Sequence, residues 1–201
     1  MSHSIYTTEG FILKSLNFGE ANKYFFIFTK EFGLIRAAAQ SVRHLKSKLR
    51  YGLEDLSLGQ VSVVRGREIW RLTSAEKKLG LVEREKLLLW SQIFSLLLRL
   101  LHGEEKNEAL FEILKEGMFF LNTLGSVKSE KEQKERAELL VSFECIMALR
   151  ILSALGYIGR LGDFDQFIIS PYFTPELIIN MSVLKSKAIL EINKSLKETH
   201  L

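Results

Sequence analysis

Short apolar stretches separated by turn-forming residues run through the first 75 residues of the chain. Ile5 to Leu16 is rich in β-branched and aromatic residues, and Asn17, Gly19 and Glu20 then supply a turn. Tyr24 to Thr29 carries apolar side chains on both faces of an extended chain. We therefore expect this second strand to be central in its sheet and covered on both sides.

Three further strands complete the predicted sheet. The turn Lys30 to Gly33, with Gly33 at a positive φ, leads into a strand over Leu34 to Ala39. Gln60 to Val64 and Glu68 to Thr73 form a hairpin around the turn Arg65 to Arg67. Five short strands with one long connection favour a small closed barrel of the OB type. An SH3-like barrel would give much the same pattern.

The period of the hydrophobic pattern changes to that of a helix after Leu81. Helices are expected over residues 83–101, 107–124 and 129–154, and one or two more between Thr174 and Lys197, where Thr174 and Pro175 suit a helix start. Gly159, Gly162 and Pro171 make the intervening stretch irregular. We therefore predict an α+β protein, with a five-stranded OB-type β-barrel over residues 1–80 and an α-helical bundle over residues 81–201.

Charge is distributed unevenly between these two predicted parts. The net charge of the chain is +4, but residues 1 to 80 hold 13 Lys and Arg against 7 Asp and Glu, a balance of +6. Residues 81 to 201 hold 15 against 17, a balance of −2. A basic barrel indicates a polyanionic partner, although basic domains without a nucleic-acid partner are common.

The basic residues gather in the stretch from Ile35 to Leu53, which has no acidic residue before Glu54. Such a stretch is either a solvated loop or a nucleic-acid contact, and its presence on a barrel of a single-strand-binding type favours contact with DNA. Phe18, Tyr24 and Tyr51 are candidates for stacking on bases, although aromatic residues in strands are more often core residues. The candidate phosphate contacts are Arg36, Arg43, Lys46, Lys48 and Arg50, with Arg65, Arg67 and Arg71 in the hairpin.

Other classes of protein find little support in the sequence. No glycine-rich phosphate loop and no nucleophile elbow is present, so we expect neither an enzyme nor a bound cofactor. The four histidines, His3, His44, His102 and His200, are too scattered for a metal site, and Cys145 has the surroundings of a buried apolar residue.

Asp163 and Asp165 lie close enough in the sequence to bind a cation, but a turn or cap role is the simpler interpretation. The longest apolar stretch, Leu87 to Leu101, is too short and too interrupted to span a membrane. The first residues have no secretory pattern, and with one cysteine in the chain a cytoplasmic location is expected.

A set of short motifs is spread over the first domain. They are Glu9-Gly10, Gly19-Glu20, Phe28-Thr29, Gly33-Leu34, Ser41 to Arg50, Leu53 and Ile69 to Thr73. Together they resemble the N-terminal domain of the bacterial RecO family of recombination mediators. Ala148 to Leu152, followed by Leu155-Gly156-Tyr157, is similar to the helix that precedes the family's zinc module.

The resemblance implies a nucleoid-associated DNA repair protein that is not an enzyme. Such a protein binds single-stranded and duplex DNA, anneals strands, and acts with RecR to replace single-strand-binding protein by RecA. The resemblance carries DNA contacts over most directly to Arg36, Arg43, Lys46, Lys48 and Arg50, and less directly to Lys14, Lys23, Arg65, Arg67 and Arg71. It also implies a pocket in the helical domain for the acidic tail of single-strand-binding protein, which no residue here identifies.

The stretch Ile158 to Tyr172 stands where many members of the family carry four zinc-binding cysteines, and here it has none. We therefore expect no metal in this chain. Two other functions stay open at this point: a basic-barrel adaptor that docks an acidic protein, and an RNA-binding OB protein.

Overall fold

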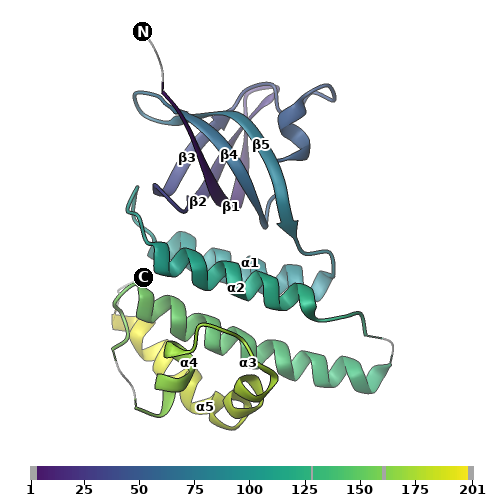
Figure 1. Cartoon of the computed structure of the whole chain (residues 1–201), viewed down its shortest axis with the longest axis vertical. Helices are drawn as coiled ribbons and strands as arrows, with labels where there is room; N and C mark the ends of the chain where they lie inside the picture. The colour runs from purple at the N-terminus through teal and green to yellow at the C-terminus, as the bar shows by residue number, and fades with distance from the viewer. Residues whose placement is uncertain (1–3, 128, 160–161, 199–201) are drawn as a thin grey trace. The chain divides into compact units, whose positions relative to one another are not determined.

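The computed structural model describes residues 4–127, 129–159 and 162–198 (Figure 1). Two compact units are present, and each is described by itself. The first unit consists of Met1–Glu83 with Phe94–Phe111, and the second consists of Arg84–Ile93 with Glu112–Leu201. The division near residue 80 that the change of period suggests stays a prediction.

Five strands close into a barrel in the order β1-β2-β3-β5-β4. Neighbours are antiparallel except β3 and β5, which run parallel and close the barrel through the pairs Ala37 with Trp70 and Ala38 with Arg71. The fold prediction, a five-stranded OB-type barrel followed by helices, is confirmed. The strands are β1 (Ile5–Phe18), β2 (Asn22–Thr29), β3 (Gly33–Ala39), β4 (Ser57–Arg65) and β5 (Trp70–Gly80).

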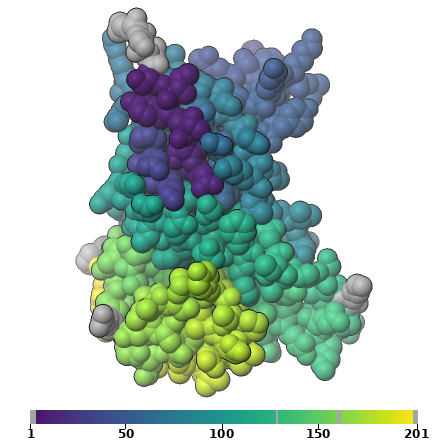
Figure 2. Space-filling view, in the orientation of Figure 1, coloured from purple at the N-terminus to yellow at the C-terminus, as the bar shows by residue number. Residues whose placement is uncertain are grey.

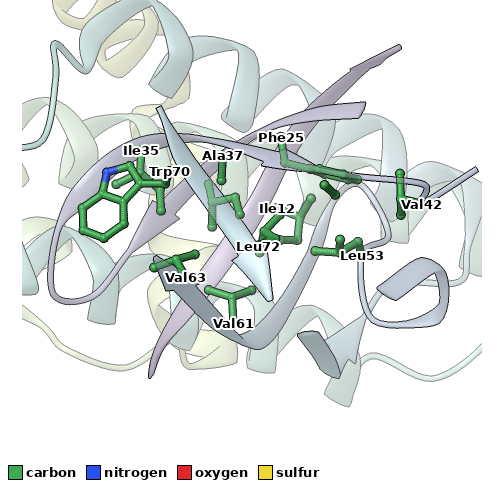
Figure 3. Packing of buried hydrophobic residues seen from close by; sticks show 12 residues of the cluster. Ile12, Phe25, Ile35, Ala37, Val42, Leu53, Val61, Val63, Trp70 and Leu72 are labelled. Carbon is green, nitrogen blue, oxygen red and sulfur yellow. The ribbon is translucent and has the colours of Figure 1, made fainter. Parts of the chain in front are cut away.

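The barrel core is built from the inward residues of every strand and two residues of the long connection. Trp70 fills one end of this core, while Phe25, Val42 and Leu53 lie together at the other end (Figure 3). These side chains are almost fully buried, as expected for residues that point into a closed barrel. The complete cluster is Ile12, Phe25, Ile27, Ile35, Ala37, Ala39, Val42, Leu53, Val61, Val63, Trp70 and Leu72.

The outer face of β2 is covered at one end only. Phe28 packs against Phe111, with ring centroids 6.1 Å apart, and Phe111 also contacts Phe11 of β1. Tyr24 and Phe26, nearer the start of the strand, remain half-buried. The prediction that both faces of β2 are covered is therefore right for its last residues. The outer face of its first residues stays open to solvent.

Gly33 sets the tight turn between β2 and β3. Its φ of +67° confirms the predicted left-handed conformation, and a Cβ atom at this position would lie 2.1 Å from the backbone oxygen of Glu105. Thr29 completes the turn, since its hydroxyl donates to the Gly33 carbonyl and accepts from the Phe32 N–H.

Four of the described helices lie where the helical period predicts them, but a short helix, Asp165–Ile169, lies within the stretch that was expected to be irregular. Ser129 caps α3 by accepting from the Glu132 N–H, and Thr174 caps α5 by accepting from the Leu177 N–H. None of the helices in the described part of the chain is both long and apolar enough to cross a bilayer. The helices are α1 (Arg84–Leu100), α2 (Glu108–Thr123), α3 (Glu130–Ala154), α4 (Asp165–Ile169) and α5 (Pro175–Glu198), with 3-10 turns η1 (Lys48–Tyr51) and η2 (Gly162–Phe164).

A buried arginine organises the irregular stretch between α3 and α5. Arg150 is 1% exposed, and its Nε and Nη2 donate to the carbonyls of Phe167 and Tyr172 at 2.7 and 3.2 Å. Its guanidinium also lies 4.2 Å from the ring centroid of Phe173. The side chain thus joins α3 to the stretch in which the resemblance would place zinc-binding cysteines.

Candidate nucleic-acid interface

Residues that pair directly across neighbouring strands share one face of a sheet, so the barrel's register identifies the residues of its open outer face. Lys14 of β1 pairs with Phe26 of β2, and Phe26 pairs with Arg36 of β3. Lys14 and Arg36 are exposed on either side of the half-buried Phe26. This first row therefore presents two cations around an aromatic ring.

The next row crosses four strands in the same way. Tyr24 lies in its middle, and Arg71 ends it at the point where β3 meets β5. Ala38 is the β3 residue of this row, and its side chain is only a methyl group. It therefore leaves a shallow surface beside the Tyr24 ring. The row consists of Leu16, Tyr24, Ala38 and Arg71.

An aromatic platform stands at the end of these two rows. The rings of Phe18 and Tyr24 are 4.5 Å apart, with an angle of 35° between their planes. The Arg36 guanidinium lies 4.3 Å from the centroid of the Tyr24 ring. Phe18 remains 48% exposed, although it is a large apolar side chain. An exposed aromatic ring beside a stacked guanidinium is a surface on which an unpaired base can stack.

The β4–β5 hairpin forms the opposite wall of a groove beside this platform. Arg67 and Arg71 line the groove together with Phe18 and Tyr24, and its cavity is about 340 Å³ in volume. Glu68 is the acidic residue of its lining. We call this surface the outer groove; its lining residues are Phe18, Asn22, Tyr24, Ala38, Gln40, Gly66, Arg67, Glu68, Ile69 and Arg71.

The connection between β3 and β4 lies on the barrel surface, where its slate-blue segment is visible in Figure 2. Arg43 ties this connection to the β1–β2 turn, because its Nη1 donates to the carbonyls of Gly19 and Glu20 at 3.4 and 2.9 Å. The Ser41 N–H donates to the side chain of Asn22 at 2.8 Å. Arg43 is therefore a structural residue as well as a candidate phosphate contact.

The other cations of this connection are exposed. Lys46, Lys48 and Arg50 form no ion pair with any residue that the structure describes. Lys48 and Arg50 stand on η1, which Leu49 anchors against the barrel core. Gly52 lies against β5 so closely that a Cβ atom would come within 2.2 Å of the Ala75 carbonyl oxygen. The loop thus holds its cations on a fixed backbone.

Two predicted residues have different surroundings. Arg65 forms an ion pair with Glu104 at 3.3 Å and lies 5.3 Å from the Trp70 ring centroid, at the other end of the barrel core from Phe25. Lys23 points into the barrel mouth, where its Nζ donates to the Ser15 hydroxyl at 3.2 Å. Of the ten predicted cations, two line the outer groove (Arg67 and Arg71), two lie on the open outer face beside it (Lys14 and Arg36), and four lie on the loop (Arg43, Lys46, Lys48 and Arg50). Arg65 lies apart from these residues, and Lys23 lies beside Arg43 and Arg50 at the barrel mouth.

Several cations elsewhere on the barrel are neutralised by acids. Lys77 pairs with Glu54, and Lys78 pairs with Glu9 at 3.3 Å. Lys30 pairs with Glu108 at 3.4 Å, and this hydrogen bond is the main cause that lowers the pKa of the Glu108 carboxyl. The positive charge that no acid balances is therefore concentrated around the outer groove and the loop.

The residues that sequence reasoning missed are the uncharged members of the open outer face. Leu16, Phe26 and Gln40 carry no charge or motif that marks a ligand surface. Their period-two alternation indicated a face of a strand, but which face stays open is decided by the pairing of strands and helices that are distant in the sequence.

The structure offers no alternative chemical centre. No group of three His, Cys, Asp or Glu side chains within the described ranges has the arrangement of a metal site, and His3 and His200 lie outside those ranges. Cys145 is buried, and burial raises the pKa of its thiol, which disfavours the reactive thiolate. Asp163 forms an ion pair with Lys187.

Comparison with known proteins shows that the barrel is similar to one family. A family model described as "Recombination protein O N terminal" matches residues 1–78. DNA repair protein RecO of Dehalococcoides mccartyi strain 195 is 28% identical over 180 residues, which cover 85% of this chain and 66% of that protein.

Two further relatives with the same name show the same pattern. The one from Thermodesulfovibrio yellowstonii is 30% identical over 158 residues, or 76% of this chain and 58% of the relative. The one from Gloeothece citriformis is 39% identical over 71 residues, or 35% of this chain and 25% of the relative. The alignments thus span from a quarter to about two thirds of the relatives' length, and the resemblance noted from the motifs is confirmed.

Proposed function

Because the N-terminal domain of this chain belongs to the RecO family, we propose that the chain is a DNA-binding protein of recombinational repair and not an enzyme. The observation that carries the proposal is the outer groove, where cations that pair with no acid among the described residues lie beside the exposed ring of Phe18 and the half-buried ring of Tyr24. Cations that no acid neutralises attract a polyanion, and the rings add a surface for unpaired bases. Neither feature by itself would point to DNA as strongly as the two together.

We propose that a single strand runs along the outer groove with its bases toward the platform. Lys14, Arg36, Arg67 and Arg71 neutralise phosphates and release counterions, while Phe18 and Tyr24 stack on bases. Lys46 and Lys48 extend the positive surface over the loop and add contacts to duplex DNA, whose phosphates need no exposed base.

The wider activities of a mediator belong to the same proposal. They are annealing of complementary strands and, together with RecR, loading of RecA onto DNA that single-strand-binding protein covers. The acidic tail of that protein has no assigned site in this chain. A groove between α3 and α5 has an apolar lining that includes Ile178 and Ile179, but Glu135 and Glu138 also line it. These carboxylates would repel an acidic tail, so we do not place the tail there.

A salt titration of DNA binding by charge-matched variants tests the proposal. Arg36→Ala/Arg71→Ala removes two cations of the outer face, whereas Lys77→Ala/Lys78→Ala removes two paired cations elsewhere, and both variants lower the net charge by two. For single-stranded DNA, each lost phosphate contact makes the negative slope of log K against log salt shallower by about 0.7. The slope of the first variant should therefore be shallower than that of the wild type by about 1.4. Arg43 stays unchanged in both variants because it also holds the loop.

The result that contradicts the groove is an equal loss of slope in the two variants, since net charge would then explain binding. Wild-type protein that fails to bind DNA at physiological salt but binds an acidic peptide would instead support the adaptor function. Competition between RNA and DNA of the same sequence separates the RNA-binding alternative, because phosphate contacts are common to both nucleic acids.

A further inference from the structure

A small concave site lies at the mouth of the barrel, at the end of the core away from Trp70. Its floor consists of Phe25, Val42 and Leu53, which close the barrel interior (Figure 3). Its rim consists of three cations, Lys23, Arg43 and Arg50, which come from β2, the β3–β4 connection and η1. The cavity is about 220 Å³ in volume. We call it the mouth site.

Hydrogen bonds fix two of the three cations in place. Lys23 is held through its bond to the Ser15 hydroxyl, and Ser15 in turn donates from its N–H and its hydroxyl to Asp55 at 3.3 and 3.0 Å. Arg43 is held through Nη1, which leaves its Nε and Nη2 without a hydrogen bond to any residue that the structure describes.

The Arg50 side chain has no hydrogen bond or ion pair with any residue in the described part of the chain, so its guanidinium is available at the rim. Asp55 is joined to this network through Ser15 and forms no ion pair with Lys23. Three cations at one small opening repel one another unless an anion joins them. The arrangement is therefore incomplete without a negatively charged ligand.

We propose that the mouth site binds a phosphomonoester at the end of a nucleic-acid strand. A phosphomonoester carries close to two negative charges at neutral pH, whereas a phosphodiester within a strand carries one, so three cations favour the terminal group. The buried floor closes the site on the side of the barrel core, so a terminal phosphate can enter it without the rest of the strand passing through. Guanidinium groups suit this ligand because their N–H groups match the spacing of phosphate oxygens.

This inference rests on the proposed DNA binding and adds a preference for strand ends. The outer groove holds the body of a strand, and the mouth site holds its phosphorylated end. The same phosphomonoester chemistry occurs in a free nucleotide, so the experiment includes one.

The test compares short single strands that carry a 5′-phosphate, a 3′-phosphate or hydroxyls at both ends, on the full chain. We expect one phosphorylated end to bind about tenfold more tightly than the hydroxyl strand, which is what one charge-assisted contact supplies. Arg50→Ala should remove most of this ratio. Lys48→Ala is the matched control, because Lys48 stands on the same 3-10 turn without lining the mouth site, and it should leave the ratio unchanged.

The outcomes separate this inference from the proposed function. Equal affinity for all three strands overturns the mouth site while DNA binding stands, and so does equal loss of the ratio in the Arg50 and Lys48 variants. Competition by deoxyadenosine monophosphate at micromolar concentration would show that a free nucleotide is the ligand and overturn the strand-end assignment. If the chain binds none of the strands, both the mouth-site inference and the proposed DNA binding are wrong.

Discussion

At the scale of single residues, the charged side chains of this protein divide by their partners. Arg65 and Arg43 look alike in the sequence as members of a basic region, yet one is neutralised by Glu104 and the other is hydrogen-bonded to two backbone carbonyls. Arg36 stacks on Tyr24 and has no acid beside it. A cation's neighbours, more than its position in a basic stretch, therefore decide whether it is available to DNA.

Arg150 is the charged residue whose loss should cost the most stability. Burial lowers the pKa of its guanidinium to about 10, so the side chain stays charged at neutral pH. Arg150→Met leaves the Phe167 and Tyr172 carbonyls without their donor, and we expect the free energy of unfolding in urea to fall by about 3 kcal/mol. Arg150→Lys keeps the charge but replaces the separate Nε and Nη2 donors by one ammonium, so its loss of unfolding free energy should be intermediate.

Lys134→Met serves as the control for Arg150→Met, because Lys134 is an exposed residue of the same helix and such substitutions change stability by at most about 0.5 kcal/mol. If the Arg150→Met protein unfolds at the same urea concentration as the wild type, the hydrogen bonds from Arg150 to the stretch before α5 contribute nothing to stability.

At the scale of elements, the sequence identified the strands but not the arrangement that makes the site. Alternation of apolar residues along β1 and β2 is a local signal, so it predicts strands and the residues that point inward. The parallel closure of β3 on β5 is not local, because Ala38 and Arg71 come from distant parts of the chain. That closure brings Arg67 and Arg71 of the hairpin beside the aromatic platform. The sequence pattern within either strand does not predict it.

The helices were predictable for a similar reason. Ser129 and Thr174 mark helix starts through hydrogen bonds to residues three positions later, which a sequence displays directly. The partners of Arg150 are two backbone carbonyls, one in the short helix α4 and one in the bend before α5, and no side-chain pattern identifies a backbone carbonyl. The sequence therefore did not predict this contact.

The aromatic platform supports a prediction at this scale. Phe18→Ala should weaken binding of single-stranded DNA by about 1–3 kcal/mol, the usual contribution of one stacked base, and weaken duplex binding much less because duplex bases are not free to stack. The measurement is a fluorescence anisotropy titration with both forms of one sequence at a single salt concentration. Tyr51→Ala is the control, since Tyr51 is an aromatic side chain that is 76% exposed on η1, outside the outer groove.

Equal losses for single-stranded and duplex DNA in the Phe18 variant would show that Phe18 supports the surface and does not stack on a base. A selective loss in the Tyr51 variant, with Phe18→Ala unchanged, would move the stacking surface from the outer groove to the loop.

At the scale of the whole molecule, two compact units divide the chain, and the candidate DNA contacts all belong to the first. The second unit has a core of its own, in which Phe143 packs against Phe120 and Phe173. A ligand stabilises the folded form of the unit that it binds, and it stabilises another unit only if the two unfold together. DNA binding therefore gives a measure of how the units are coupled.

Hydrogen exchange with and without single-stranded DNA measures that coupling. At a free DNA concentration 100 times the dissociation constant, amides that exchange only when the barrel opens should gain about 2.7 kcal/mol of protection. We expect the gain in β1, β2 and β3 and little change in α3 and α5, because the outer groove is built on the barrel alone. The Arg36→Ala/Arg71→Ala variant at the same DNA concentration should gain less, since its dissociation constant is larger. Protection that rises in the helices and not in the strands would place the DNA on the second unit, and an equal rise in both units would show that they unfold as one.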